Sequence, residues 1–211
     1  NTKKLDPRIS FARASTGAYY DGKTVSKAEE NLFLYSQEFD NAYWSKINVS
    51  VSANTTTAPD GTTTADSVIE SATTAQRPIR RFVTTVNGTY VFSVFAKANT
   101  RSWIFTGGPI GNAWFNVSTG TIGTVDAGVT ASIQNFGNGW YRCVAMVTTT
   151  AASNAFDVTL TTGDNISSYA GDGTSGVYLW GAQLENGSSV TAYTPTTTAT
   201  APAVYQPTLL T

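Results

Sequence analysis

The fold of this chain is decided by residues 169–188, YAGDGTSGVYLWGAQLENGS. A glycine-rich turn leads into the apolar run 177–184, and Asn186-Gly187 closes the run. Glycine and asparagine tolerate the positive φ that tight turns require, and a short apolar run between two such turns is typical of a buried strand. We therefore expect residues 176–184 to form a strand.

The same design recurs from about residue 31 to residue 193. The clearest alternation is YVFSVFAK, residues 90–97, in which Tyr90, Phe92, Val94 and Ala96 point one way and the intervening side chains the other. One set should face the core, and the other a more polar, concave surface. Further strands are expected at residues 76–86, 102–106, 113–117, 130–136, 140–148 and 155–161.

Turn signals separate these segments, and no long stretch has helical periodicity. The sequence therefore predicts an all-β chain with a two-sheet antiparallel β-sandwich. The turn signals are at residues 58–61, 87–88, 107–112, 118–120, 137–139, 171–173 and 186–187.

Composition suggests three parts. Residues 1–30 hold most of the early charge and read as an extended leader, with one helical turn expected within residues 26–34. Residues 31–193 form the sandwich. Residues 194–211 are rich in Thr and Pro and are expected to be an extended arm that grips another surface.

The composition argues against several classes of function. There is no histidine, which removes imidazole-based triads and argues against an ordinary zinc site. The formal net charge of −1 gives no basic footprint for nucleic acid. No apolar run approaches the roughly 20 residues that cross a bilayer, so membrane insertion is not expected. The one cysteine, Cys143, lies in an apolar run and reads as a buried, inert thiol.

Several phrases, in this order, resemble a domain that recurs in the virion proteins of tailed bacteriophages. That domain is broadly similar to jelly-roll carbohydrate-binding modules and lectins. The resemblance spans most of residues 5–197, and the order of the phrases carries it more than any single one. The phrases are ISFARAST (9–16), NLFLYSQEFDNAYW (31–44), APDGTTTAD (58–66), YVFSVFAK (90–97), FNVSTGT (115–121), GNGWYR (137–142) and GDGTSGVYLWGAQLE (171–185).

The resemblance implies a jelly roll in a tail fibre, receptor-binding protein or decoration of the virion, an extracellular particle. It implies host attachment through a surface polysaccharide, contacts with other virion proteins, and a homo-oligomer such as a trimer. Fold does not establish function, so sugar binding enters by analogy. Some such modules hold a structural calcium ion, for which Glu38 and Asp40 are the candidate ligands here; no other cofactor is implied.

Sugar binding requires flat aromatic faces and polar groups that bind hydroxyls. Trp103 and Trp114 flank the turn at residues 107–112 and are the candidate platforms. Arg101 and Lys97 are candidate donors to hydroxyls or carboxylated sugars. Tyr43 completes the candidate set. We expect three other indoles to be structural, those of Trp44, Trp140 and Trp180.

Three functions remain open at this point. The leading hypothesis is a non-enzymatic module that binds glycan. The second is a structural connector, baseplate or capsid-decoration domain. The third is a polysaccharide depolymerase, which would need two carboxylates facing each other about 5–9.5 Å apart. Most acids lie in or beside turns, and Glu70 and Asp157 are the two worth testing.

Overall fold

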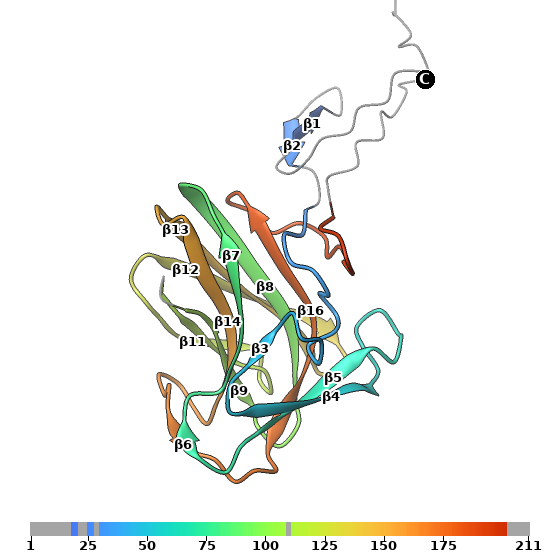
Figure 1. Ribbon diagram of the computed structural model, residues 1–211, viewed down its shortest axis with the longest axis vertical. Coiled ribbons are helices and arrows are strands. Elements are labelled where there is room, and N and C mark those ends of the chain that lie inside the picture. Colours follow the sequence, from blue (N-terminus) through green and yellow to red (C-terminus); the bar gives the residue numbers. More distant parts are fainter. Residues whose placement is uncertain (1–17, 21–24, 28–29, 109–110, 202–211) are drawn as a thin grey trace, which may run out of the picture.

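The computed structural model describes residues 18–20, 25–27, 30–108 and 111–201, and every regular element in these ranges is a β-strand (Figure 1). Two six-stranded antiparallel sheets lie face to face, which confirms the predicted β-sandwich. We name each sheet after a central strand. Two further pairs of short strands stand apart from the sheets: β1 (Ala18–Tyr20) with β2 (Val25–Lys27), and β6 (Thr74–Ala75) with β15 (Tyr169–Ala170).

The β14 sheet has the order β11-β10-β9-β14-β7-β3. Its strands are β3 (Ser45–Lys46), β7 (Pro78–Thr84), β9 (Trp103–Gly107), β10 (Ala113–Asn116), β11 (Thr121–Val125) and β14 (Ser153–Thr161).

The β16 sheet has the order β12-β13-β8-β16-β5-β4. Its strands are β4 (Val49–Thr56), β5 (Ala65–Glu70), β8 (Gly88–Ala98), β12 (Val129–Gly137), β13 (Trp140–Thr149) and β16 (Gly176–Asn186).

The connections make this sandwich a jelly roll. Omitting the edge strands β3, β4, β11 and β12, the inner order is β5-β16-β8-β13 in one sheet and β7-β14-β9-β10 in the other. The chain crosses between the sheets at most connections, and the last strand, β16, returns to lie beside the first, β5. This double Greek-key arrangement is that of a jelly roll, as the resemblance implied.

Residues 176–186 form β16, which includes the strand predicted at 176–184 and has a bulge at its centre. Its pairing with β8 changes register between Trp180 and Gln183, and Gly181 there has φ 63°. Trp180 faces outward by ordinary alternation with Leu179, and the bulge shifts the alternation by one residue so that Ala182 faces the core again. A Cβ on Gly181 would lie 3.0 Å from the Phe95 ring, so glycine is required by conformation and by space.

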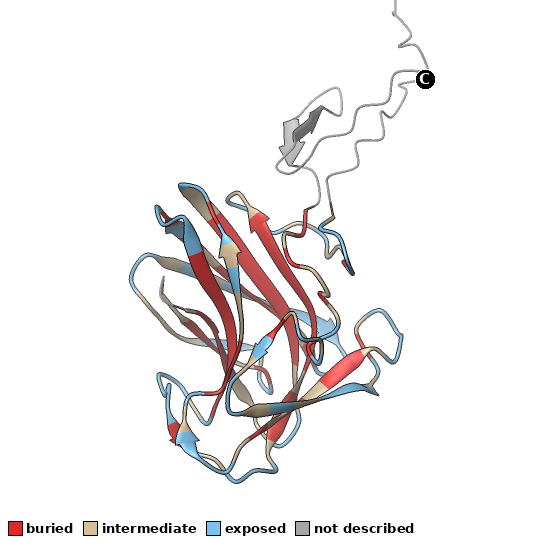
Figure 2. Cartoon of the chain, in the orientation of Figure 1, coloured by how far each residue is buried: buried red, intermediate tan, exposed pale blue. Residues whose placement is uncertain are grey.

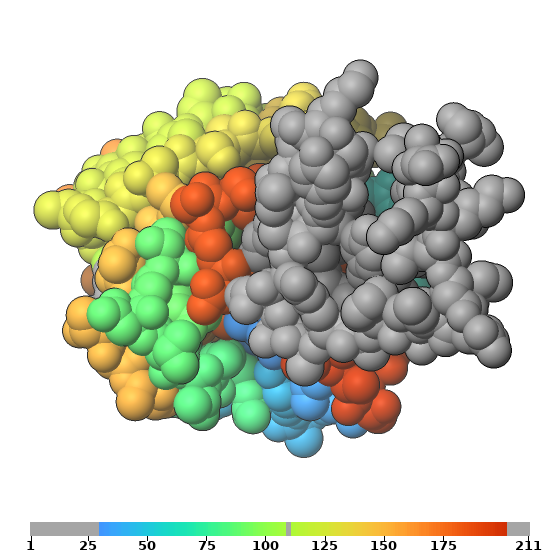
Figure 3. Space-filling view, turned by 90° about the horizontal axis from the view of Figure 1, so that it is seen from above, coloured from blue at the N-terminus to red at the C-terminus, as the bar shows by residue number. Residues whose placement is uncertain are grey.

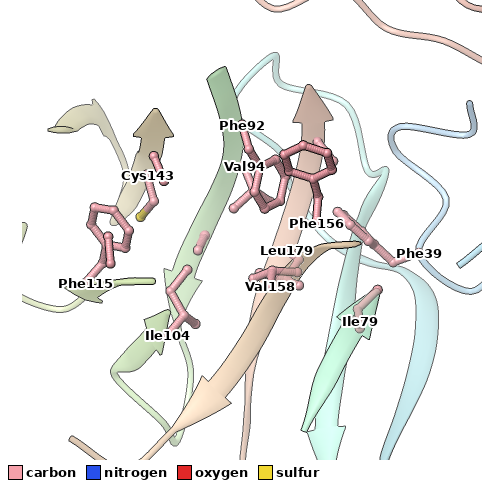
Figure 4. Packing of buried hydrophobic residues seen from close by; sticks show 14 of the residues in the cluster. Phe39, Ile79, Phe92, Val94, Ile104, Phe115, Cys143, Phe156, Val158 and Leu179 are labelled. Atoms are coloured by element: carbon pink, nitrogen blue, oxygen red, sulfur yellow. The ribbon is translucent and has the colours of Figure 1, made fainter. Parts of the chain in front are cut away.

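The core fills the space between the sheets with side chains from both (Figure 4). Phe92, Val94 and Leu179 come from the β16 sheet and meet Phe156 and Val158 of the β14 sheet. Figure 2 shows the buried colour running along the central strands. Cys143 is fully buried in this cluster, and burial raises the pKa of its thiol well above the usual range. The expected inert thiol is therefore confirmed.

The outer face of the β16 sheet is also partly covered, by segments that we call the two roofs. The first roof, residues 57–64, covers two indoles: Trp140 Nε1 donates to Thr57 O at 3.0 Å, and Trp180 Nε1 donates to Thr64 Oγ1 at 2.9 Å. The second roof is residues 188–194, of which Thr191 accepts a hydrogen bond from Arg142 at 2.7 Å through its carbonyl oxygen. The outer face of the β16 sheet, which was expected to be a concave polar surface, is therefore covered by the two roofs over most of its length.

The chain enters and leaves the sandwich at the same end, which we call the near end. Asn31 and Ala201 form a bridge, and the Asn186 N–H, at the end of β16, donates to Glu30 at 3.0 Å. Residues 194–201 lie against residues 31–36, so this part of the expected arm contacts the domain. The opposite end, which we call the distal end, carries the last residues of β8 and the first residues of β9 and β16.

Two sequence expectations fall on the first part of the chain. The helical turn expected within residues 26–34 does not form in its described residues: β2 is a strand that includes residues 26–27, and residues 30–34 are not helical. The Ile9 phrase of the leader lies outside the described residues.

Phe156 and Phe82 give a matched test of this packing, because both are phenylalanines of the β14 sheet. Phe156 is 1% exposed and Phe82 is 58% exposed. We expect Phe156→Ala to lower the free energy of unfolding by about 3–5 kcal/mol, through lost burial and the cavity left behind. Phe82→Ala should change it by about 0.5 kcal/mol or less. Urea denaturation measures both, and equal losses would contradict the assigned faces.

Candidate glycan-binding surfaces

Trp103 is the one tryptophan of this chain that is not buried, and it begins β9 at the distal end. Its ring lies over Gly123 of the edge strand β11. A Cβ on Gly123 would lie 2.8 Å from the Trp103 ring and 2.2 Å from Asp164 Oδ1. The ring and the Asp164 carboxylate therefore share the space that the missing side chain leaves, and they lie side by side.

The Asp164 carboxylate is fixed by β11. Thr124 donates its N–H to Oδ1 at 2.6 Å and its hydroxyl to Oδ2 at 3.1 Å. A carboxylate has about four acceptor positions, so this leaves room for further donors. An aromatic face beside an oriented carboxylate has the two features that a sugar ring needs, a stacking surface and a hydroxyl acceptor.

Trp114 is only 4% exposed, so it does not serve as the predicted surface platform. Its ring packs on Phe105, with centroids 4.9 Å apart, and its Nε1 donates to Ile166 O at 3.4 Å. The loop of residues 162–168 covers it, which hairpin spacing alone does not reveal. Buried positions are confirmed for the three indoles expected to be structural, Trp44, Trp140 and Trp180.

Tyr43 lies away from the distal end, beside the short edge strand β3. Its partly buried ring packs under the Arg81 guanidinium, 4.0 Å from the ring centroid, and Arg81 also donates to Tyr43 O at 3.2 Å. The structure therefore does not bring Tyr43 together with Trp103, Arg101 or Lys97.

Arg101 lies at the distal end, but its guanidinium is held by acids. It donates to Glu70 at 2.7 and 3.0 Å and contacts Asp172 at 3.4 Å. Glu70 also accepts hydrogen bonds from Tyr169 Oη at 2.6 Å and from the Asp172 N–H at 2.8 Å. Arg101 thus joins β5, the β8–β9 loop and the β15–β16 loop, and it is a structural residue rather than a free donor.

The two acids singled out for hydrolysis are each paired with a different arginine. Glu70 ends β5 in the β16 sheet, whereas Asp157 lies in β14 of the other sheet, where Arg80 Nε donates to it at 2.7 Å. Burial raises the pKa of Asp157, and Arg80 offsets this only in part. Asp157 alternates with Phe156 and Val158, which enter the core, so its carboxylate lies on the outer face of the β14 sheet and does not face Glu70 in the other sheet.

The surroundings of Glu38 and Asp40 do not fit the calcium site that the resemblance implied. Both acids are exposed. The nearby buried acid, Asp66, accepts hydrogen bonds from the N–H groups of Phe39 at 2.8 Å and Asn54 at 3.0 Å. Calcium takes six to eight oxygen ligands, and N–H groups cannot supply them. The part of the chain that the structure describes holds no group of three or more potential metal-binding side chains.

Lys97 lies at the distal end on the outer face of the β16 sheet, where the two roofs stop. Its neighbours in register are Trp140 on β13 and Tyr178 on β16, and Tyr178 pairs in turn with Ser67 on β5. Lys97, Tyr178 and Ser67 are all partly exposed. With Ser52, the exposed in-register partner of Ser67 on β4, they form a row that we call the Lys97 strip.

No protein-family model and no curated protein matches this chain. Within the described ranges, no helix is long and apolar enough to span a membrane.

Trp103 and Lys97 were candidates from the sequence, but the residues that lie beside them were not. Asp164 follows β14 by a few residues and reaches Thr124 across forty positions, a contact that no local pattern signals. Ser67 and Ser52 lie in strands that were not predicted. The alternation of Tyr178 and Trp180 in residues 176–180 was a usable signal, because it places Tyr178 on the outer face with Trp180.

Glu70→Gln tests the cluster around Arg101. Burial alone would raise the pKa of Glu70, but hydrogen bonds from Arg101, Tyr169 and the Asp172 N–H outweigh it, and the pKa is lowered from 4.5. The ionised group therefore stabilises the fold fully above pH 4.5, and this contribution is lost as the pH falls through the lowered pKa. We expect Glu70→Gln to cost about 3 kcal/mol at pH 7.

The free energy of unfolding, measured by urea titration between pH 7 and pH 3, checks this. The difference between wild type and Glu70→Gln should shrink at the acid end. Glu38→Gln is the matched control, because Glu38 is exposed, and it should cost about 0.5 kcal/mol or less. Equal costs for the two variants at pH 7 would contradict the arrangement.

Proposed function

We propose that this chain is a non-enzymatic module of a bacteriophage virion that binds glycan on the host surface. The proposal rests on the opposite placement of the chain connections and the candidate binding residues. The chain enters and leaves the sandwich at the near end, whereas Trp103 and the Lys97 strip lie at the distal end. A module held at one end presents the other end outward. The ordered phrases of the sequence supply the virion context, and the jelly-roll fold is compatible with it.

The adjacent entry and exit points of the sandwich, at residues 31 and 201, argue for an appended module over a connector within a fibre. A connector in line passes the chain from one end to the other, whereas here residues 30–31 and 201 lie together. The side chains at the distal end suit recognition better than catalysis. Glu70 is the one of the two candidate hydrolytic acids that lies at this end. It is buried, and its carboxylate accepts hydrogen bonds from Arg101, Tyr169 and a backbone N–H.

One observation favours a role in virion assembly as well. Phe82 and Val86 are 58% and 65% exposed, the highest values among the large apolar residues of the described chain. Phe82 lies near the end of β7 and Val86 lies in the turn between β7 and β8. Figure 3 shows this part of the chain (green) at the near end. Exposed apolar side chains there suit a contact with another virion protein.

Trp103→Ala tests the binding role. We expect loss of the stacking face to weaken binding to the recognised polysaccharide about tenfold, measured by isothermal titration after a glycan array has identified it. Gly123→Ala should also weaken binding, because its methyl group displaces Trp103 and Asp164 without removing either.

Phe82→Ala is the control, since it removes an exposed ring at the near end. It should bind glycan as the wild type does. Absence of binding to every glycan by the folded wild-type chain would contradict the proposal. If in addition Phe82→Ala changed the mass of the protein in solution, assembly would become the better account.

A further inference from the structure

Lys97 differs from every other basic side chain that the structure describes. It has no hydrogen-bond, ion-pair or cation–π partner among the described residues. Each of the others is engaged by backbone carbonyls, carboxylates, hydroxyls or rings. The engaged side chains are Lys46, Arg77, Arg80, Arg81, Arg101 and Arg142.

The side chain of Lys97 is nevertheless held in place. Its stem lies along the turn at Asn138-Gly139: a Cβ on Gly139 would lie 3.4 Å from Lys97 Cε and 3.7 Å from Cγ. Gly139 has φ 81°, so the turn keeps glycine there and the stem keeps its support. A stem packed on protein loses less rotamer entropy when the ammonium group binds a ligand, which favours binding.

Lys97 carries the only charge in the Lys97 strip. Lys97, Tyr178, Ser67 and Ser52 are consecutive in register across four neighbouring strands. Three strand spacings of about 4.8 Å make a strip about 14 Å long, which suits an oligosaccharide rather than a single sugar. The strip offers one cation, one aromatic ring and two hydroxyls, and no carboxylate lies in it to neutralise the cation.

We propose that the Lys97 strip binds an anionic glycan, with a carboxylate or phosphate of the polysaccharide at the Lys97 ammonium and a sugar ring on Tyr178. This rests on the proposed glycan-binding function and adds the chemical class of the ligand. A neutral sugar would form no ion pair with the unpaired Lys97 ammonium. An anionic group forms a charge-assisted hydrogen bond, about twice as strong as a neutral one.

The experiment uses the full chain on an array of neutral, carboxylated and phosphorylated glycans, followed by titration with polygalacturonate and its neutral methyl ester. Teichoic acid, a phosphate-bearing polymer, separates the two sources of negative charge. We expect binding to anionic glycans and loss of that binding when the carboxylates are esterified. Lys97→Gln should weaken it about tenfold or more, and Lys97→Arg by less.

Two comparisons make the test specific to the strip. Lys46→Gln removes the same charge from β3 in the other sheet, so it should leave glycan affinity near that of wild type. Tyr178→Phe keeps the ring and should bind better than Tyr178→Ala. Circular dichroism confirms that each variant is folded.

The outcomes separate the two proposals. Binding of neutral glycans with no effect of Lys97→Gln would overturn this inference and leave the proposed function standing. Equal losses in Lys97→Gln and Lys46→Gln would also overturn it, because bulk charge would then explain the binding. Absence of binding to any glycan would overturn the proposed function, and this inference with it.

Discussion

The central constraint of this structure is that β8 and β16 are buried on both faces over most of their length. One set of side chains enters the core between the sheets, and the opposite set also needs cover. The roofs at residues 57–64 and 188–194 supply it, and the bulge at Gly181 lets a Trp and an Ala two residues apart serve opposite faces. At the distal end, beyond the roofs, the outer-face residues Lys97 and Tyr178 of these strands remain partly open to solvent.

Polar residues in the middle of these strands follow from the same constraint. Gln183 is fully buried, and it accepts from the Thr194 N–H at 2.7 Å and donates to Ala192 O at 3.1 Å. Glu185 accepts from Thr191 Oγ1 at 2.6 Å. Burying such groups is costly unless each is hydrogen-bonded, so they specify where the second roof lies. These contacts hold the second roof on the outer face of the β16 sheet.

Much of the fold could be predicted because turn residues and period-two patterns are local. All the predicted strands from residue 76 onward were found, among them β8, β13 and β16. Among the strands of the two six-stranded sheets, β3, β4, β5 and β11 were missed. In β5 the acids Asp66 and Glu70 are buried beside apolar residues, which hides the usual alternation, and β11 is a partly exposed edge strand without apolar alternation. The site was predicted less well. The loop of residues 162–168 covers Trp114 and leaves Trp103 partly exposed, which no local pattern indicates. The pairing of Arg101 with Glu70 joins residues far apart in sequence.

We propose that recognition takes place at the distal end of this jelly roll, with Lys97 as the free cation among the described residues. The most direct test is an NMR titration of the labelled chain with a glycan that it binds, following backbone amide shifts. The account predicts that the largest changes fall on residues 97–103 and 176–178 and on Gly123. Changes centred on residues 82–86 or 31–36 instead would contradict it.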